Sequence, residues 1–457
     1  MDTPICDFVT EYVRRGGVRM HMPGHKGVPA LGPEPMDITE IAGADEIFAS
    51  RGIIRKSEEN AAALFGARRT VYSAEGSSLC VRAMVYLACL RAAEKGIPKR
   101  ILAGRNAHRA FIAAAALADI DVDWIYPGEA EGLLSCTVTP EEVARRLRER
   151  EYAAVYVTSP DYTGRMADIR GIAGVCRAHG VPFLADNAHG AYLKFLKEDL
   201  HPMTLGADVC CDSAHKTLDC LTGAAYLHIA ETAPEGWAEA AEAATGLFGS
   251  TSPNWLILQS LDRMNRELSG EWPGKLRRAA ERVAATKERL RREGWELAGG
   301  EPMKITLLPK GKGLTGDEAH DLLRENGIEC EFSDPDYLVL MPGVNTAEEE
   351  FQRVEKALRK AGRALPRRGG DSSAFGFRTT PNGQVLLREA EKVCSIREAM
   401  FSPAEGIPAE DAEGRIMAGC DASCPPAVPV VVPGERITKE AIDALRYYGK
   451  EKVTVMK

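Results

Sequence analysis

The stretch "ADIRGIAGVCRAHGVPFLAD" (167–186) joins a helical pattern that closes with glycine to a short apolar strand pattern. Similar strand patterns recur along the chain, at "RRTVYSA" (68–74), "RILAG" (100–104), "VDWIY" (122–126), "YAAVYVTS" (152–159), "ADVCCDS" (207–213) and "GAAYLHIA" (223–230). Helical patterns separate several of them, over 78–96, 110–119 and 140–150. Strands that alternate with helices are typical of an α/β domain with a mostly parallel sheet.

A second domain is expected after this one. A charged helical pattern over 274–294 leads into a β-α-β-β-α pattern over 303–362. The polar stretch "ALPRRGGDSSA" (364–374) has the composition of a linker, and the Pro-rich "SCPPAVPVVVPGE" (423–435) precedes a final helix from Thr438. We therefore expect an N-terminal segment (1–57), a large domain (58–295), a small α/β domain (296–365) and a C-terminal α+β domain (366–457).

The composition limits the class of protein. The 457 residues are 45% hydrophobic, which is enough for a large core, and the net charge of −8 argues against a broad nucleic-acid-binding surface. No apolar run reaches the length of a membrane span, and the N-terminus lacks the pattern of a signal peptide. The twelve cysteines form neither CxxC pairs nor Cys/His clusters at metal-ligand spacing, so we expect reduced thiols, a cytoplasmic protein and no metal site.

A candidate anion site lies at "AEGSS" (74–78), where a strand pattern turns into a helical pattern. Backbone amides at a helix start attract phosphate, and hydroxyl groups from Ser77 and Ser78 follow Gly76 directly. The plain alternative is that Ser77 only caps the helix.

Two further candidates follow strand patterns at the expected carboxyl edge of the sheet, where ligands bind in open α/β folds. In "DNAHGAY" (186–192), Asp186 is placed to keep a pyridine nitrogen protonated; its alternative is a capping Asp beside a core His189. In "DSAHKT" (212–217), Lys216 is placed to form an imine, with Ser213 and His215 able to hold a phosphate. Taken alone, Lys216 is better explained as a solvated surface lysine.

Two more segments point to the same ligand. His108 ends a strand pattern and opens a helical one, where an imidazole can stack on an aromatic ring. Ser250, Thr251 and Ser252 form a hydroxyl-rich turn before Pro253. The alternatives are a helix-start histidine, and Ser252 as an N-cap with proline at the first helical position. The joint order of these segments nevertheless matches the parts of a pyridoxal 5′-phosphate site.

These motifs resemble those of the ornithine/lysine/arginine decarboxylases, which have the aspartate-aminotransferase fold (PLP fold type I). The resemblance rests on the segments just described and, in addition, on "HMPGHKG" (21–27), "DITEIAGADEIFAS" (37–50), "IRKSEENAAALFGARRTVYSAEGSS" (54–78), "STSPNW" (250–255) and "PPAVPVVVPGERIT" (425–438). Glu75 stands where the family more often has Asn. The chain resembles the shorter, biosynthetic type, without a receiver-like N-terminal domain.

The resemblance implies roles for single residues. Lys216 would be the Schiff-base lysine, Asp186 the partner of the pyridinium nitrogen, and His108 the residue stacked on the ring. The remaining cofactor contacts would come from Gly76, Ser77, Ser78, His189, Ser213 and His215, and from Ser250, Thr251 and Ser252 toward the phosphate of a neighbouring subunit. The implied assembly is a homodimer or larger homo-oligomer with shared active sites.

The implied reaction is decarboxylation of arginine, lysine or ornithine to an amine and CO2, by a carboxy-lyase of polyamine synthesis. His215 or Lys216 would return the proton to Cα. Acidic partners for the substrate's distal group are sought among Asp45, Glu46, Asp161 and Glu435. The alternatives are another PLP reaction, such as transamination or aldol cleavage, and a catalytically silent relative with a regulatory role. A transaminase usually anchors the α-carboxylate with an arginine of its small domain; Arg353 and Arg359 lie on a charged helical pattern there, and neither stands out.

Overall fold

The computed structural model describes residues 1–364, 378–386, 388–421 and 426–457. Two compact units share the chain: unit 1 consists of Met1–Lys99, Val143–Tyr156 and Ile169–Leu276, and unit 2 of Arg100–Glu142, Val157–Asp168 and Arg277–Lys457. The expected linker, apart from Ala364, lies outside the described residues, and so does the start of the Pro-rich segment.

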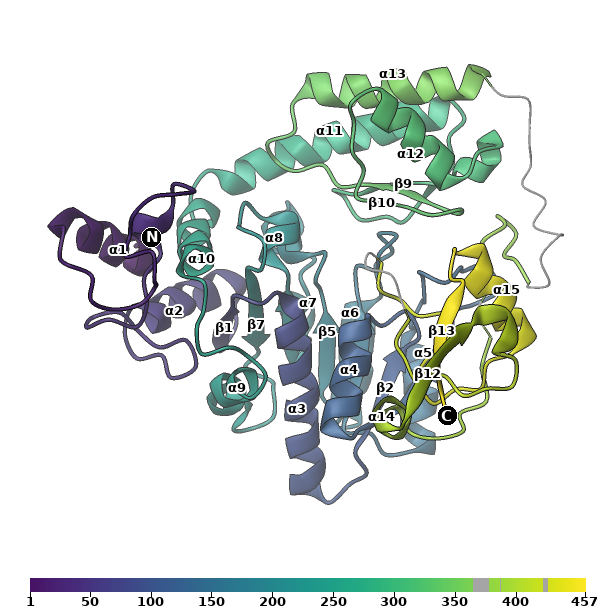
Figure 1. Ribbon diagram of the computed structural model, residues 1–457, viewed down its shortest axis with the longest axis horizontal. Helices are drawn as coiled ribbons and strands as arrows, with labels where there is room; N and C mark the ends of the chain where they lie inside the picture. Colours follow the sequence, from purple (N-terminus) through teal and green to yellow (C-terminus); the bar gives the residue numbers. More distant parts are fainter. Residues whose placement is uncertain (365–377, 387, 422–425) are drawn as a thin grey trace. The chain divides into compact units, whose positions relative to one another are not determined.

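Seven strands form the main sheet, in the order β1-β7-β6-β5-β4-β2-β3 (Figure 1). They are β1 (Arg69–Ser73), β2 (Arg100–Gly104), β3 (Asp121–Ile125), β4 (Ala154–Thr158), β5 (Phe183–Asp186), β6 (Val209–Asp212) and β7 (Ala225–Ile229). β5 pairs in parallel with β6, and β2 with β3, whereas β7 is antiparallel to both of its neighbours. The expected α/β fold with a mostly parallel sheet is confirmed.

In unit 1, α3 (Ser77–Lys95) packs along β1, β6 and β7, and α2 (Ile53–Phe65) packs on β1 (Figure 1). α3 is buried over most of its length, which explains why its apolar residues show no single stripe. The other helices of this unit are α1 (Pro4–Arg15), α6 (Ile169–Ala178), α7 (Pro202–Leu205), α8 (Ala214–Thr217), α9 (Trp237–Gly246) and α10 (Trp255–Leu268), with 3-10 turns η1 (Glu34–Met36) and η2 (Ala191–Phe195). Helices α5 (Pro140–Glu149) and α11 (Trp272–Arg292) each contribute to both units.

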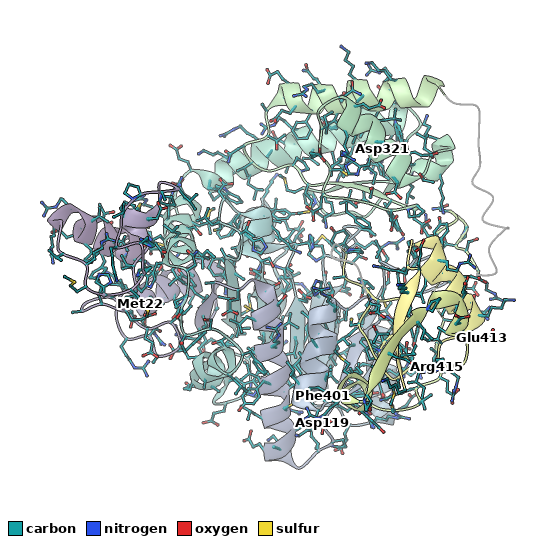
Figure 2. All side chains as sticks on the ribbon, in the orientation of Figure 1. Met22, Asp119, Asp321, Phe401, Glu413 and Arg415 are labelled. Atoms are coloured by element: carbon teal, nitrogen blue, oxygen red, sulfur yellow. The ribbon has the colours of Figure 1, made fainter. Side chains whose placement is uncertain are left out.

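Unit 1 also carries an exposed N-terminal apolar segment, defined by Val18, Met20, Met22, Val28 and Leu31. Met20 is 89% exposed and Leu31 is 91% exposed, and Figure 2 labels Met22 in the same segment. A cluster of bare apolar side chains marks an interaction surface more often than scattered ones do.

Unit 2 contains a four-stranded antiparallel sheet, in the order β10-β11-β9-β8, and the two-stranded sheet β12-β13. Its strands are β8 (Leu297–Ala298), β9 (Ile305–Leu307), β10 (Phe332–Ser333), β11 (Leu338–Leu340), β12 (Ala404–Pro408) and β13 (Lys452–Met456). Its helices are α4 (Arg109–Ala118), α12 (Gly316–Glu325), α13 (Glu348–Ala364), α14 (Ile396–Phe401) and α15 (Lys439–Tyr447), with 3-10 turns η3 (Pro309–Lys312) and η5 (Ala409–Asp411). Within the described ranges, no helix combines the length and hydrophobicity needed to cross a bilayer.

Candidate active site

The turn between β1 and α3 forms the anion side of the site. Gly76 is the N-cap of α3, with φ +73° and ψ 178°, and its N–H donates to the carbonyl of Gly223 at 2.7 Å. The plain alternative, that Ser77 caps the helix, is wrong, because Gly76 is the N-cap and Ser77 is already the first residue of the helix. Its hydroxyl instead accepts a hydrogen bond from Ser213 Oγ at 2.8 Å. The first-turn amides of a long helix and two hydroxyls thus meet here.

The end of β5 holds a fixed carboxylate. Asp186 is only 3% exposed; its Oδ2 accepts from the hydroxyl of Tyr156 at 2.7 Å, and its Oδ1 accepts from the amide of Ala188 at 3.2 Å. Tyr156, on β4, was not singled out from the sequence. The available signal was a buried strand carrying a phenol, because such a hydroxyl usually needs a hydrogen-bonding partner.

Lys216 lies in the one-turn helix α8 and is not a plain surface lysine. Its Nζ is 3.0 Å from Nε2 of His189, and that imidazole is 5% exposed. Both residues follow strands that pair in parallel, β6 and β5. The amine and the Asp186 carboxylate are therefore delivered to the same edge of the sheet.

His215 has a defined tautomer. Its Nδ1 is 2.9 Å from the carbonyl oxygen of Ala224, and a carbonyl only accepts, so Nδ1 carries a proton. The neutral ring consequently has no proton on Nε2 to give away.

Beneath the site, Asp212 accepts hydrogen bonds from four fully buried side chains, one of them the thiol of Cys210 at 3.6 Å from Oδ1. Its Oδ2 accepts from Nε2 of His201 at 2.8 Å and from Nε2 of His228 at 3.2 Å, and its Oδ1 accepts from Nδ2 of Asn187 at 2.7 Å. Burial raises the pKa of Asp212, but the adjacent His201 and His228 outweigh it and hold that pKa well below its ordinary value. Because Asn187 follows Asp186, and Asp212 precedes Ser213, this network fixes both turns of the site.

The serine-rich turn before α10 lies against the anion side. The backbone amide of Ser250 donates to Oε1 of Glu75 at 2.6 Å, which gives Glu75 a structural role in this chain. Ser250, Thr251 and Ser252 are exposed. The reading of Ser252 as the N-cap is wrong: Asn254 caps α10, with Oδ1 accepting from Leu256 N at 2.9 Å.

The remaining sequence-based candidate, His108, belongs to unit 2. It is the N-cap of α4, where its Nδ1 accepts from the amide of Ala110 at 3.0 Å. This agrees with its plain reading as a helix-start residue, and stacking on a cofactor ring stays a prediction.

Three of the four acids considered for the substrate's distal group already accept hydrogen bonds from other groups of the protein. Asp45 accepts from amides at the start of α2, including Gly52 N at 2.7 Å. Asp161 accepts from Thr163 and Arg165, and burial raises its pKa. Glu435 accepts from Val432 N at 2.8 Å and lies 3.5 Å from Nη2 of Arg105. Glu46 is exposed, and its carboxylate pairs with no residue that the structure describes.

The donor set of unit 1 fits pyridoxal phosphate. Amides and hydroxyls gather at the start of α3 for a phosphate, a primary amine stands beside a buried imidazole for an aldehyde, and a fixed carboxylate suits a ring nitrogen. At Gly76 the positive φ disfavours any side chain, so the cradle keeps its backbone open toward the ligand.

Comparison with known proteins agrees with this geometry. The sequence profile of "Orn/Lys/Arg decarboxylase, major domain" matches residues 3–352, and that of the family's C-terminal domain matches residues 377–452. The chain is 28% identical to an arginine decarboxylase of Bacillus subtilis, over 96% of this chain and 92% of the relative, and 28% identical to one of Bacillus anthracis, over 97% and 92%.

Solved structures share the fold. The constitutive lysine decarboxylase of E. coli aligns with a TM-score of 0.76 at 19% identity, covering 100% of this chain and 82% of that one. Lysine decarboxylase A of Pseudomonas aeruginosa gives 0.78 at 16% identity, covering 97% and 76%. Since the major-domain profile alone spans well over half of the residues, the chain belongs to the Orn/Lys/Arg decarboxylase family, and it is a carboxy-lyase with PLP fold type I.

Proposed function

We propose that the chain uses pyridoxal phosphate to decarboxylate a basic amino acid, with arginine as the first candidate substrate. The observation that carries the proposal is the contact of 3.0 Å between Lys216 Nζ and the buried His189, beside the fixed carboxylate of Asp186. Arginine is preferred over lysine and ornithine because relatives from Bacillus subtilis and Bacillus anthracis that align over nearly the whole chain are named arginine decarboxylases.

When bound, the cofactor supplies an electron sink for the electrons of the Cα–carboxylate bond. The chain's residues do the rest. Asp186 holds a proton at the ring nitrogen, and its own position is fixed by the Tyr156 hydroxyl. Ser77, Ser213 and the first amides of α3 bind the phosphate and so orient the ring. This orientation matters because the electrons of the Cα–carboxylate bond can enter the ring system only when that bond is perpendicular to the ring.

The proton that replaces CO2 on Cα is assigned to Lys216. A charged Lys216 donates a hydrogen bond to Nε2 of His189, so the imidazole fixes the position of the ammonium group and stabilises its protonated form. Neutral His215 carries its ring proton on Nδ1, where the carbonyl of Ala224 accepts it, so it could act as donor only when doubly protonated. This leaves Lys216 as the better of the two donors considered.

For the distal guanidinium or ammonium, we propose Glu46. Asp45, Asp161 and Glu435 hold protein donors, whereas the exposed carboxylate of Glu46 can accept a cationic group without breaking such bonds.

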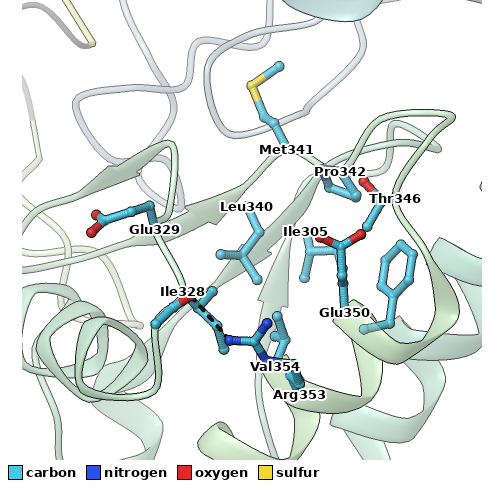
Figure 3. A pocket seen from close by; sticks show the side chains of 12 residues that line it. Ile305, Ile328, Glu329, Leu340, Met341, Pro342, Thr346, Glu350, Arg353 and Val354 are labelled. Carbon is cyan, nitrogen blue, oxygen red and sulfur yellow. Dashed lines mark hydrogen bonds between the residues drawn. The ribbon is translucent and has the colours of Figure 1, made fainter.

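Transamination is disfavoured by the small-domain arginines. Nη2 of Arg353 donates to the carbonyls of Asn326 at 3.1 Å and Gly327 at 3.3 Å and so closes the end of α12, beside a cavity of about 260 Å³ (Figure 3). Arg359 pairs with Glu293 at 2.6 Å. Both side chains are engaged, so neither is a ready anchor for the α-carboxylate that a transaminase retains.

We also propose a cytoplasmic homo-oligomer that serves polyamine synthesis. The exposed N-terminal apolar segment and the exposed turn Ser250–Ser252 support assembly, since both are suited to contact a second copy.

The test begins with absorbance. Purified protein with added pyridoxal phosphate should absorb at about 420 nm, as the cofactor does when joined to a lysine. Lys216→Ala and Lys216→Arg should both lose the band, whereas the exposed Lys197→Ala should keep it.

Release of CO2 is then measured with arginine, lysine and ornithine, each with an equal yield of amine. A wild-type protein that neither shows the band nor binds the cofactor would be the silent relative. Formation of an oxo acid in place of CO2 would mean that the reaction is transamination.

A further inference from the structure

Unit 2 contains a cavity of about 520 Å³ that the proposed reaction does not use. This volume lies within the range of roughly 300–1,000 Å³ that is usual for small-molecule sites. The cavity is formed by the small α/β fold and the C-terminal segments together: α12 and β10 supply one side, and the residues around Val428 and the end of α15 supply the other.

The cavity has an apolar side. Leu134, Val428 and Phe332 line it and belong to one hydrophobic cluster, and Leu445 adds to it from α15. The aromatic rings of Tyr447 and Tyr448 also line it, and their hydroxyls donate to the buried Asp336 at 2.7 and 2.6 Å. With their hydroxyls bonded to Asp336, the rings offer carbon surface to a guest, and Lys310 Nζ already lies 5.2 Å from the centroid of the Tyr447 ring.

The polar side is acidic. Four carboxylates line the cavity, and the cations on its wall are Lys450 and, when protonated, His320. The acids are Asp317, Glu331, Asp334 and Asp421. A wall with this excess of carboxylates beside aromatic rings favours a cationic guest.

Asp334 is the residue that points to a ligand. It is 8% exposed, and its Oδ1 accepts from the amides of Asp336 and Tyr337, both at 2.7 Å. Its Oδ2 accepts no hydrogen bond from any residue that the structure describes. Burial, with the nearby charge of Asp336, holds the pKa of Asp334 well above its ordinary value. A deeply placed carboxylate with one oxygen unmatched is costly unless a cation comes to it.

A second oxygen is available close by. Glu331 is exposed at the same wall, and only its Oε1 is engaged, by the hydroxyl of Tyr162 at 3.0 Å. A bidentate or two-ended cation can therefore meet two carboxylates and pack its carbon stem on Phe332 and the tyrosines.

We propose that this cavity binds a small organic cation with an apolar stem, an alkyl diamine or an aminoalkyl guanidine, with Asp334 and Glu331 meeting its charged groups. This ligand class includes the amines that decarboxylation of basic amino acids yields. The site would thus let the end product bind to residues other than Lys216, all of them in unit 2. The binding itself does not depend on the proposed reaction.

The test is isothermal titration of the full chain bearing Lys216→Ala, without added cofactor, so that the amine has no lysine-bound cofactor to react with. The probes are agmatine and 1,5-diaminopentane. Two controls accompany them: 1-pentanol, which has an apolar stem without a charge, and sodium chloride, which adds the same ionic strength without an amine. We expect one amine per chain and no binding of the alcohol. Because the pKa of Asp334 is raised, a cation that binds its ionised form should cause the protonated carboxyl group to lose its proton, so the measured heat should change with the buffer's ionisation enthalpy.

The decisive comparison is Asp334→Asn, which keeps the acceptor for the two amides and removes the charge. It should weaken amine binding at least about tenfold. Glu331→Gln should also weaken amine binding, but less than Asp334→Asn does. Asp321→Asn is the matched control: Asp321, labelled in Figure 2, is an exposed residue of α12 and is not among the residues that line the cavity. Circular dichroism checks that each variant is folded.

Equal affinity in wild type, Asp334→Asn and Glu331→Gln would overturn the proposal, and so would the absence of amine binding in the parent chain. Failure to release CO2 from any amino acid would instead count against the proposed function and leave the titration result standing.

Discussion

Asp212 shows what one buried charge contributes to the site. Nδ1 of His201 accepts from the amide of Met203, and Nδ1 of His228 lies 2.8 Å from the hydroxyl of Thr70, so both rings present Nε2–H to the carboxylate. Two imidazoles, one amide and the thiol of Cys210 therefore solvate a single negative charge in the interior. Burial, which outweighs the adjacent Asp212, also lowers the pKa of His228 and favours its neutral form.

We predict that Asp212→Asn destabilises unit 1 by about 3 kcal/mol at pH 7, since an amide oxygen cannot match the charge and one buried N–H loses its acceptor. The folded-state pKa of Asp212 is depressed, so its stabilisation is present above the unfolded pKa and is lost as the pH falls through the folded value. The difference in stability between wild type and Asp212→Asn should therefore become smaller below about pH 4.

Thermal midpoints at a series of pH values measure this. Asp199→Asn, which removes a partly exposed ion pair with Lys194, is the control and should cost less than about 1 kcal/mol. A gap that widens toward low pH would contradict the prediction.

The site residues that could be predicted from sequence are those that carry chemistry in a short motif. Lys216, Asp186 and Ser213 stand at strand ends, and the order of the motifs suggested their common site. Tyr156 and Asn187 were missed, and so was the role of Asp212. Their function lies in partners that are distant in the sequence, and only the packing of β4, β5 and β6 brings those partners together.

At the scale of elements, the turn after β5 depends on a glycine. A Cβ added to Gly190 would lie 2.0 Å from Oδ1 of Asn187 and 2.8 Å from Cδ1 of Leu193. Asn187 is tied to Asp212 and cannot easily withdraw. The turn carries both Asp186 and His189, so a shift here reaches two residues that we propose to contact the cofactor.

We predict that Gly190→Ala costs about 1–3 kcal/mol and weakens cofactor binding, because the turn must open to admit the methyl group. The thermal midpoint and a titration with pyridoxal phosphate measure the two effects. Gly174→Ala in α6 is the matched control: a Cβ there meets nothing within 4 Å, and alanine favours a helix. If both variants bind the cofactor like wild type, the turn does not need its glycine.

Strands were easier to predict than helix starts. All seven strands of the main sheet coincide with apolar patterns in the sequence. The caps of α3 and α10 were misplaced because several residues near each start can cap, and the backbone angles of the actual turn decide between Ser77 and Gly76, or Ser252 and Asn254. The antiparallel direction of β7 was equally hidden, since a buried strand has the same apolar pattern in either direction.

At the scale of the whole molecule, the exposed N-terminal apolar segment predicts how copies associate. Leu31 is 91% exposed, and burying such a side chain is worth roughly 1.5–3 kcal/mol. Leu31→Glu should therefore shift the protein toward the monomer in light scattering coupled to gel filtration.

Leu117→Glu, an exposed apolar position on α4 outside this segment, serves as the control and should leave the mass unchanged. An oligomer that persists in Leu31→Glu and in the double variant with Met20→Glu would assign the assembly to another surface.

The interleaving of the two units has a consequence for biosynthesis. Unit 1 receives its last residue at Leu276, whereas unit 2 needs the chain up to Lys457. At usual rates of translation the intervening stretch takes roughly 10–40 s to emerge. Gly76, Asp186, His189 and Lys216 are thus all available on the ribosome-bound chain while much of unit 2 is still unmade. A nascent chain can therefore meet the cofactor before its own synthesis ends.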